Sequence, residues 1–286
     1  MSNNARTIPG LPLIDKPGGI GPAGGVRRVE ILGMPGVGKT FLLKRLRRLG
    51  GSVAPFLGYK ERVGALKFRY RWSRYQLGFI TDLLPDAIAR RALRGGYQYR
   101  ARELETRALI DFVESHQDLA VWLIGAVDAA DAAARDKVLV LSWFHRLFAD
   151  YRLATDSKDS GRCRHRFLMF DEGFAQKAVS LALHLNFTPA MVGEYATHMP
   201  SPDLLIVIDA PDEVIFQRLE QRGWPSWVAP TDEEGKRRFM VCCRDAVLAM
   251  VDALAARGVS VVTVSNEGSG ESVAKRMASL LSAHQG

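Results

Sequence analysis

The chain of 286 residues has little cysteine, no long apolar run and no leader pattern. Its three cysteines, Cys163, Cys242 and Cys243, lack the spacing of zinc ligands and are too few for a disulfide framework. No apolar run reaches the roughly 18 residues of a membrane-spanning helix. Residues 1–25 are rich in Gly and Pro and lack the charged-then-apolar order of a signal peptide. We therefore expect a cytoplasmic protein with reduced thiols and a flexible N-terminal segment.

Acidic residues are also comparatively few. The 31 Asp and Glu face 39 Lys and Arg, which gives a formal net charge of +8. Most of the excess lies between residues 59 and 107. Such a charge suits nucleic acid, an anionic membrane surface or phosphorylated substrates as partners.

A glycine-rich string, GMPGVGKT at residues 33–40, is the most specific motif. An apolar run that suits a strand precedes it, and FLLKRLRRLG follows it with apolar residues at helical spacing. This is the context of a P-loop, whose glycines let main-chain N–H groups surround a phosphate chain at a helix N-terminus. Lys39 would reach the β- and γ-phosphates, and the Thr40 hydroxyl would bind Mg²⁺. We therefore expect ATP and Mg²⁺ as ligands, with the nucleotide contacted by Gly33, Met34, Pro35, Gly36, Val37, Gly38, Lys39, Thr40 and Phe41.

The rest of the chain predicts further strands and a helical segment. The apolar runs at residues 167–170, 204–208 and 259–265 are typical of buried strands, and helical patterns separate them. Between about residues 60 and 155, apolar spacing predicts helices near residues 81–93, 99–116, 119–131 and 136–151.

These patterns predict an α/β protein of P-loop NTPase type, with three α/β/α layers and a parallel sheet. A helical insertion is expected between the first helix and the strand that ends at Asp171. We expect residues 1–25 to be the flexible segment and residues 26–286 to form a single kinase-like domain. The acceptor-binding insertion would span about residues 60–155.

Two carboxylates and two arginines are candidates for phosphoryl transfer. Asp171 and Glu172 follow the apolar run FLMF and could bind Mg²⁺ or accept a proton from the attacking hydroxyl. Arg218 and Arg222 lie four apart on a predicted helix and could close over the γ-phosphate. The alternatives are a helix N-cap pair and solvated ion pairs. The predicted catalytic residues are Lys39, Asp171, Glu172, Arg218 and Arg222, and the predicted Mg²⁺ ligands are Thr40 and Asp171.

Three strings carry a family resemblance. FLMFDEGFAQKAVSL resembles a strand and helix of the thymidylate kinase and deoxynucleoside kinase group, and PDLLIVIDAPDEVIFQRLEQRGWP is similar to that group's strand, helix and lid. VVTVSNEGSGESVAKRMASLL resembles the last strand and helix of the group. The resemblance implies a nucleotide kinase-like P-loop fold in which Asp171 is the strand-end acid and Arg218 and Arg222 are lid arginines. Glu172 and Trp224 stand where arginines are common in the group, and the loss of the arginine at position 172 argues mildly against a nucleoside monophosphate acceptor.

These features favour an ATP-dependent small-molecule kinase, whose acceptor is anionic or bears a hydroxyl group. The arginine-rich string KFRYRWSRYQ, at residues 67–76, would recognise an anionic acceptor or would form a solvated helix face. The sequence does not decide between a monomer and a homodimer.

Two other classes stay open. An AAA-type or signalling ATPase would use Glu172 to polarise water, although no convincing sensor strand or small C-terminal helical domain follows. A nucleic-acid-binding protein would use the aromatic and arginine side chains that alternate in FRYRWSRY as a stacking surface. A GTPase is disfavoured because the chain has no N-K-x-D string after a late strand.

Overall fold

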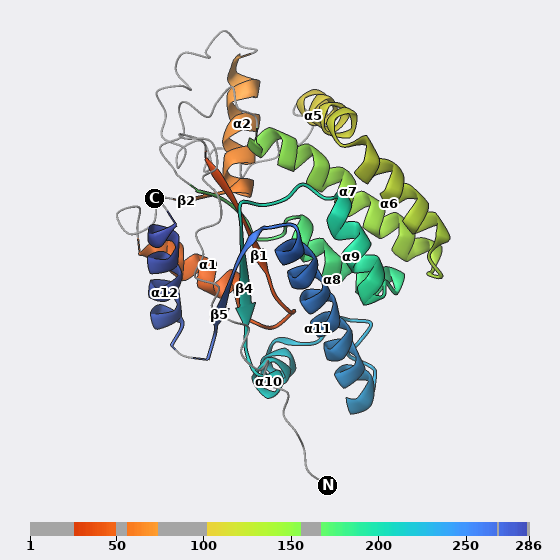
Figure 1. Cartoon of the computed structure of the whole chain (residues 1–286), viewed down its shortest axis with the longest axis vertical. Coiled ribbons are helices and arrows are strands. Elements are labelled where there is room, and N and C mark those ends of the chain that lie inside the picture. The colour runs from red at the N-terminus through yellow and green to blue at the C-terminus, as the bar shows by residue number, and fades with distance from the viewer. Residues whose placement is uncertain (1–25, 50–55, 74–101, 156–166, 268, 285–286) are drawn as a thin grey trace.

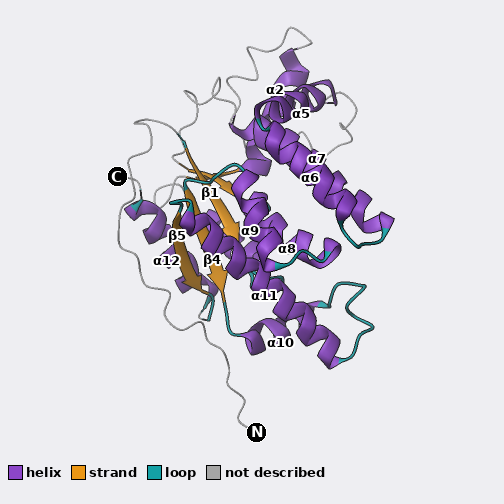
Figure 2. Cartoon of the chain, turned by 45° about the vertical axis from the view of Figure 1, so that its right-hand side comes forward, coloured by secondary structure: helices purple, strands orange, loops and turns teal. Residues whose placement is uncertain are grey.

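A parallel sheet with helices on both faces forms the body of the protein (Figure 1, Figure 2). The computed structural model describes residues 26–49, 56–73, 102–155, 167–267 and 269–284. The sheet has five strands in the order β2-β3-β1-β4-β5, and every neighbouring pair is parallel. The strands are β1 (Arg27–Leu32), β2 (Phe56–Gly58), β3 (Phe167–Phe170), β4 (Leu204–Asp209) and β5 (Ser260–Ser265).

The helices separate into two layers and an insertion. The layer helices are α1 (Lys39–Arg48), α8 (Phe174–Leu185), α9 (Pro189–His198), α10 (Asp212–Arg222), α11 (Glu233–Ala256) and α12 (Gly270–Ala283). The insertion between α1 and β3 contains α2 (Tyr59–Ser73), α5 (Arg102–Ser115), α6 (Gln117–Ala129) and α7 (Ala134–Thr155). Helices α1 and α12 pack together on one side of the sheet, while α8, α9 and α11 pack together on the other (Figure 1). The predicted α/β P-loop fold with its helical insertion is therefore confirmed.

Three predicted helices of the insertion are present in the structure, and their ends differ from the predicted ends by a few residues. The expected helices near 99–116, 119–131 and 136–151 correspond to α5, α6 and α7, whereas the one near 81–93 lies outside the described residues. Helix α9 was not predicted, although Thr188 and Pro189 give the usual signal of a helix start. The Thr188 hydroxyl accepts a hydrogen bond from the Met191 N–H at 3.4 Å and caps this helix.

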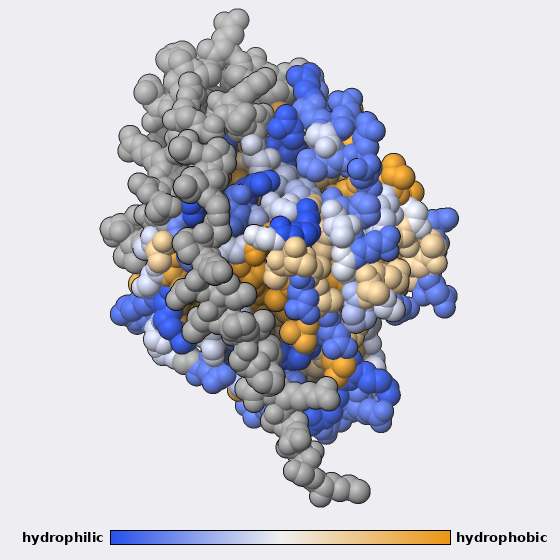
Figure 3. Space-filling view, in the orientation of Figure 1, coloured by the Kyte–Doolittle hydropathy of each residue, from blue (hydrophilic) through white to orange (hydrophobic). Residues whose placement is uncertain are grey.

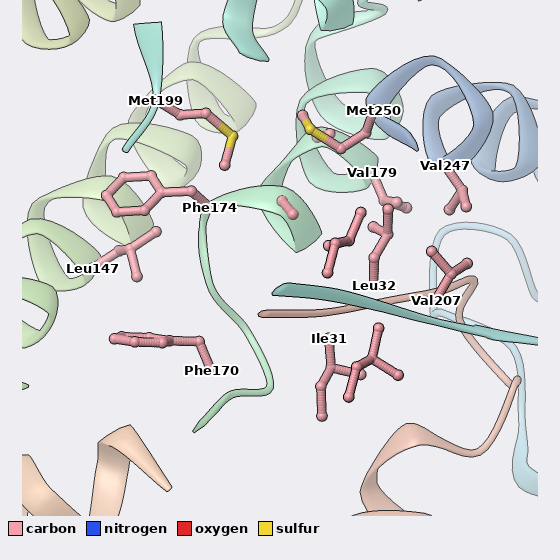
Figure 4. Packing of buried hydrophobic residues seen from close by; sticks show 14 of the residues in the cluster. Ile31, Leu32, Leu147, Phe170, Phe174, Val179, Met199, Val207, Val247 and Met250 are labelled. Atoms are coloured by element: carbon pink, nitrogen blue, oxygen red, sulfur yellow. The ribbon is translucent and has the colours of Figure 1, made fainter. Parts of the chain in front are cut away.

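The core is built on the three central strands. All four residues of β3 are buried, and β4 is buried except at its last residue. In Figure 4, Leu32 lies with Val179 and Met250 on one side of β1, and Ile31 lies on the other. Successive residues of a strand point to opposite faces, so both faces of β1 are covered by apolar side chains. This burial explains the near-continuous apolar runs in the sequence.

The described residues on the face shown in Figure 3 are mostly hydrophilic, with apolar patches among them. Val121 and Ile124 on α6 are 71% and 63% exposed. Exposed single apolar residues are common in folded proteins. No described helix is long and apolar enough to cross a membrane.

A buried carboxylate joins β1 to the start of α8. Glu30 is 2% exposed, and its two oxygens accept hydrogen bonds from the N–H groups of Phe174 at 3.1 Å and Ala175 at 2.6 Å. These N–H groups have no partners within the helix, so Glu30 caps α8 from another element. Gly173 makes this approach feasible because a Cβ there would lie 2.6 Å from the Glu30 carboxyl carbon. The position of α8 therefore depends on Glu30.

Glu30 should make stability depend on pH. Burial raises its pKa from 4.5 to about 7, although the two N–H groups oppose this shift. The folded protein therefore holds the proton more tightly than the unfolded chain, and the unfolding free energy should fall as pH rises from 4.5 to 7. The loss should be about 3 kcal/mol. Glu30→Gln, which stays neutral, should lack this component.

Urea unfolding of both proteins across this pH range measures the effect. The other titrating groups are shared, so the difference between the two curves isolates Glu30. The unfolding free energy of the wild type relative to Glu30→Gln should be highest near pH 4.5 and should fall as pH rises to about 7, because only Glu30 differs between the two proteins. Parallel curves would show that Glu30 does not titrate in this range.

Candidate functional site

The glycine loop lies between β1 and α1, where the sequence places it. Gly36 and Gly38 have φ values of 85° and 98°, which side chains rarely adopt, and Gly38 precedes the first residue of α1. Gly33 lies against the end of β4, where a Cβ would come within 2.5 Å of the Ile208 carbonyl oxygen. Its N–H donates to Gln176 Oε1 of α8 at 3.2 Å. The loop is thus fixed at its first residue by two neighbouring elements.

Lys39 is held by the loop itself. Its Nζ donates to the carbonyl oxygens of Gly33 at 2.5 Å and Met34 at 3.1 Å. Burial lowers the pKa of the Lys39 ammonium to about 8, and nearby carboxylates, including those of Asp171 and Glu172, oppose the shift. An anionic ligand would favour the charged form of this lysine. The ammonium is therefore already positioned at the glycine loop.

A second group of hydrogen bonds holds the far end of the loop. The carbonyl oxygen of Val37 accepts from Asn266 Nδ2 at 2.7 Å and from Arg218 Nη1 at 3.1 Å. Arg218 also donates through Nη2 to the Asn266 carbonyl at 3.0 Å. Asn266 is buried, directly after β5, and its own N–H donates to the carbonyl of Asp209 at the end of β4. Two segments distant in sequence, α10 and the residue after β5, therefore converge on one loop carbonyl.

The two carboxylates after β3 lie close to this loop. Lys60 Nζ is 2.8 Å from Glu172 Oε2 and 3.7 Å from Asp171 Oδ1. The hydrogen bond from Lys60 holds the pKa of Glu172 below its usual range, and Lys177 and Lys39 act in the same direction. Asp171 and Glu172 are 25% and 58% exposed at the side chain, so a ligand can reach both. Lysine and carboxylate side chains thus lie close together at the C-terminal ends of β1 and β3.

Lys60 owes its position to the start of α2. This helix begins at Tyr59, directly after the short strand β2, which pairs with β3. The buried Tyr59 ring stacks on Phe170 with centroids 4.9 Å apart, so the first turn of α2 rests on the end of β3. No local pattern in the sequence indicates this arrangement, because the pairing joins residues more than a hundred positions apart.

The structure separates the two predicted lid arginines. Arg218 is half-buried and bound to loop and Asn266 carbonyls, whereas Arg222 is exposed and has no hydrogen bond or ion pair with the described residues. Arg222 still lies near enough to Lys39 to lower its pKa. The Arg218 guanidinium therefore supports the loop, and Arg222 is the arginine available to a ligand.

The remaining predicted residues lie around the loop. Thr40 is exposed at the start of α1, and its hydroxyl has no protein partner among the described residues. Phe41 is 50% exposed, with the Arg45 guanidinium 4.6 Å from its ring centroid. The other strand-end carboxylate, Asp209, is paired with Arg244 at 3.2 Å. The carboxylates available at this edge are thus Asp171 and Glu172.

Magnesium would suit these residues. No group of three or more His, Cys, Asp or Glu side chains in the described part of the chain could form a metal cage. Mg²⁺ in phosphate sites usually takes one or two protein oxygens, phosphate oxygens and water. The accessible Thr40 hydroxyl and Asp171 carboxylate match that ligand set.

Comparisons with known proteins give no family. No protein-family model matches the chain, and no curated protein matches its sequence. The crystal structure of TT1252 from Thermus thermophilus shares 14% identity with a TM-score of 0.38, covering 92% of this chain and 100% of that one. Shikimate kinase from Acinetobacter baumannii, solved with shikimate, shares 13% identity with a TM-score of 0.35, covering 91% and 95%. Neither likeness is close enough to assign an activity, and the resemblance to the thymidylate kinase group stays a prediction.

Removing the Asn266 amide should weaken both the fold and nucleotide binding. In Asn266→Ala the Val37 carbonyl keeps only Arg218 as a donor, so the unfolding free energy should fall by about 1–3 kcal/mol. The loop would also lose order that it must then recover on binding, which should raise the dissociation constant for ATP. Urea unfolding and calorimetric titration measure the two effects.

The neighbouring Glu267 provides the control. It is exposed and makes no hydrogen bond with the described residues, so Glu267→Ala should change the unfolding free energy by no more than about 0.5 kcal/mol. Equal behaviour of the two variants would contradict the role given to Asn266.

Proposed function

We propose that the chain is an ATP-dependent phosphotransferase, a nucleotide kinase-like enzyme that acts on a small molecule. The observation that carries the proposal is the meeting of Lys39 with Asp171 and Glu172 at one sheet edge. A loop that surrounds phosphates and a carboxylate that faces the acceptor are the two parts that phosphoryl transfer needs. The thymidylate kinase-like assignment is the narrower form of this proposal.

The chain's own groups have separable tasks. The loop N–H groups and Lys39 would bind the β- and γ-phosphates, and Arg222 would approach from α10. An acceptor oxygen forms a bond to the γ-phosphorus as the bond from that phosphorus to the bridging oxygen of ADP breaks. The proton of an acceptor hydroxyl passes to Asp171 or Glu172. Arg218 contributes by holding the loop through Val37.

The two oxygen ligands identified above would hold a metal ion beside the phosphates. Thr40 and Asp171 would hold Mg²⁺, which neutralises charge on the phosphates when it is bound. Lys60 keeps Glu172 ionised near neutral pH, since its hydrogen bond lowers the pKa of that carboxyl. The lowered pKa makes Glu172 a weak base, so it would act chiefly through its charge.

ATP hydrolysis without an acceptor is the second candidate. The observation in its favour is the exposure of Glu172, whose carboxylate can contact water directly after a buried strand. Against it, β3 pairs directly with β1, so no additional strand such as a sensor strand lies between them among the described residues.

ATP turnover with Mg²⁺, measured alone and with nucleosides, nucleotides, sugars and sugar phosphates, tests both candidates. Phosphate on one class of acceptor supports a kinase, and steady hydrolysis that no compound changes supports an ATPase.

Nucleic-acid binding has less support. Residues 74–76 of the aromatic and arginine-rich string lie outside the described residues, and residues 67–73 belong to α2. Lys67 at its start is paired with Glu105 at 2.5 Å and Asp150 at 3.2 Å, so its charge joins α2 to α5 and α7. A homodimer, a cytoplasmic location and one kinase-like domain over residues 26–286 remain predictions.

Lys39→Ala should abolish phosphoryl transfer and leave the fold intact. The side-chain ammonium donates hydrogen bonds only to carbonyl oxygens of its own loop among the described residues, so its loss mainly removes positive charge from the phosphates. ATP turnover and circular dichroism measure the two properties. Lys44→Ala, an exposed position on the same helix, is the control and should keep wild-type turnover. Turnover retained in Lys39→Ala would overturn the P-loop assignment.

Glu172→Gln separates the two candidate functions. In an ATPase the variant should bind ATP and stall, because the group that polarises water is lost. In a kinase it should lose mainly the turnover that depends on the acceptor. Binding of ATP and single-turnover hydrolysis, with and without acceptor, distinguish these outcomes. An unchanged rate under both conditions would exclude Glu172 from either reaction.

A further inference from the structure

Three hydrogen-bond donors on α7 and α8 lie together without acceptors. They are the Lys177 ammonium, the Trp143 indole N–H and the Arg146 guanidinium, here called the donor cluster. None has a hydrogen bond or ion pair with any residue in the described ranges. Helices α7 and α8 pack against each other, which brings the three side chains to one surface. Neither the glycine loop nor the carboxylate pair uses these groups.

Lys177 is placed where a structural lysine would be unfavourable. It lies in the first turn of α8, at the end of a helix dipole that repels cations. Burial lowers the pKa of its ammonium, and Lys60 and Arg146 lower it further, while Glu172 opposes them. Its Nζ lies 5.2 Å from the centroid of the Trp143 ring. A cation kept in such surroundings without an ion pair is typical of a binding site.

The aromatic side of the cluster is held in place. Trp143 is partly buried, and its ring contacts the edge of His184 with centroids 5.0 Å apart. The His184 Nδ1 atom lies 3.0 Å from Asp136 Oδ1, which fixes the imidazole ring. Arg146 follows Trp143 by three positions on α7 and so projects from the same face of that helix. A fixed aromatic wall and two cations are features of an anion site.

Glu172 links the cluster to the glycine loop. Both Lys177 and Lys39 lie near enough to Glu172 to lower the pKa of that carboxyl, although its hydrogen bond is to Lys60. Glu172 is therefore close enough to interact electrostatically with Lys39 of the loop and with Lys177 of the donor cluster. A ligand that reached from the loop to the cluster would place one end at the γ-phosphate and the other at the three donors.

We propose that the donor cluster binds an oxyanion group of the phosphoryl acceptor. This inference rests on the proposed function and narrows it. The acceptor is a small molecule that carries a carboxylate or phosphate group apart from the atom that receives the γ-phosphate. Lys177 and Arg146 neutralise the oxyanion, and the Trp143 indole N–H donates to it. The site lies on α7 and α8 and does not require the arginine-rich string at residues 67–76.

Anion binding to nucleotide-loaded protein tests the proposal. The glycine loop is first saturated with Mg²⁺ and the non-hydrolysable ATP analogue AMP-PNP, so that added anions cannot enter it. Inorganic phosphate and acetate are then titrated separately, with calorimetry and tryptophan fluorescence as readouts. Lys177→Met and Arg146→Met should each weaken anion binding about tenfold and leave AMP-PNP binding unchanged. Arg135→Met is the control, since Arg135 is exposed on α7 about three turns away, and it should match the wild type.

The outcomes separate the two proposals. If phosphate binds more tightly than acetate, the acceptor carries a phosphate, and the reverse order assigns a carboxylate. Failure of both anions to bind loaded wild-type protein, or equal binding by all variants, overturns the oxyanion site and leaves the kinase proposal standing. If AMP-PNP itself does not bind, the kinase proposal fails, and phosphate is titrated against free protein. If Lys177→Met weakens phosphate binding to the free protein and Lys39→Ala does not, the donor cluster is supported as an oxyanion site. The opposite result overturns the oxyanion site.

Discussion

The buried contact between Glu30 and the first turn of α8 positions much of the site. It joins the strand that leads into the glycine loop to the helix that follows the carboxylate pair. Through α8 it also sets the position of Gln176, which binds Gly33, and of Lys177 in the donor cluster. A charged group in the core is costly unless it is hydrogen-bonded. Here the unpaired N–H groups of a helix N-terminus supply both the partners and a favourable dipole.

The opposite end of the loop is held by the C-terminal half of the chain. Asn266 and Arg218 reach the Val37 carbonyl from the segment after β5 and from α10. The proposed nucleotide site thus depends on three strand ends of the parallel sheet, as ligand sites in open α/β sheets generally do. The same hydrogen bonds restrain α10, so any movement of Arg222 would occur on a helix whose neighbouring arginine is fixed. Arg218 and Arg222 therefore have different tasks, although they lie four residues apart on the same helix.

Local patterns in the sequence predicted the parts of the fold that depend on local physics. The apolar runs of β3 and β4 and the glycine string with its flanks need only periodicity and turn chemistry to be recognised. Glu30 was not recognised, because a single carboxylate in a strand acquires its meaning only when α8 lies against it. Lys60 and Asn266 were not recognised for the same reason, since Glu172 and Val37, to which they donate, lie more than a hundred residues away in the chain. The helix start at Thr188 and Pro189 was a local signal, and α9 could have been predicted from it.

The hydrogen bonds of Lys39 have a consequence for selectivity among anions. In the free loop its ammonium is already engaged by two carbonyl oxygens, so an incoming ligand must replace these internal partners before it gains from the charge. A small monovalent ion offers little in exchange, whereas a polyphosphate compensates through several loop N–H groups at once. The loop therefore favours highly charged ligands, because its own backbone competes for the Lys39 ammonium and only a ligand with several charged oxygens compensates for that contact.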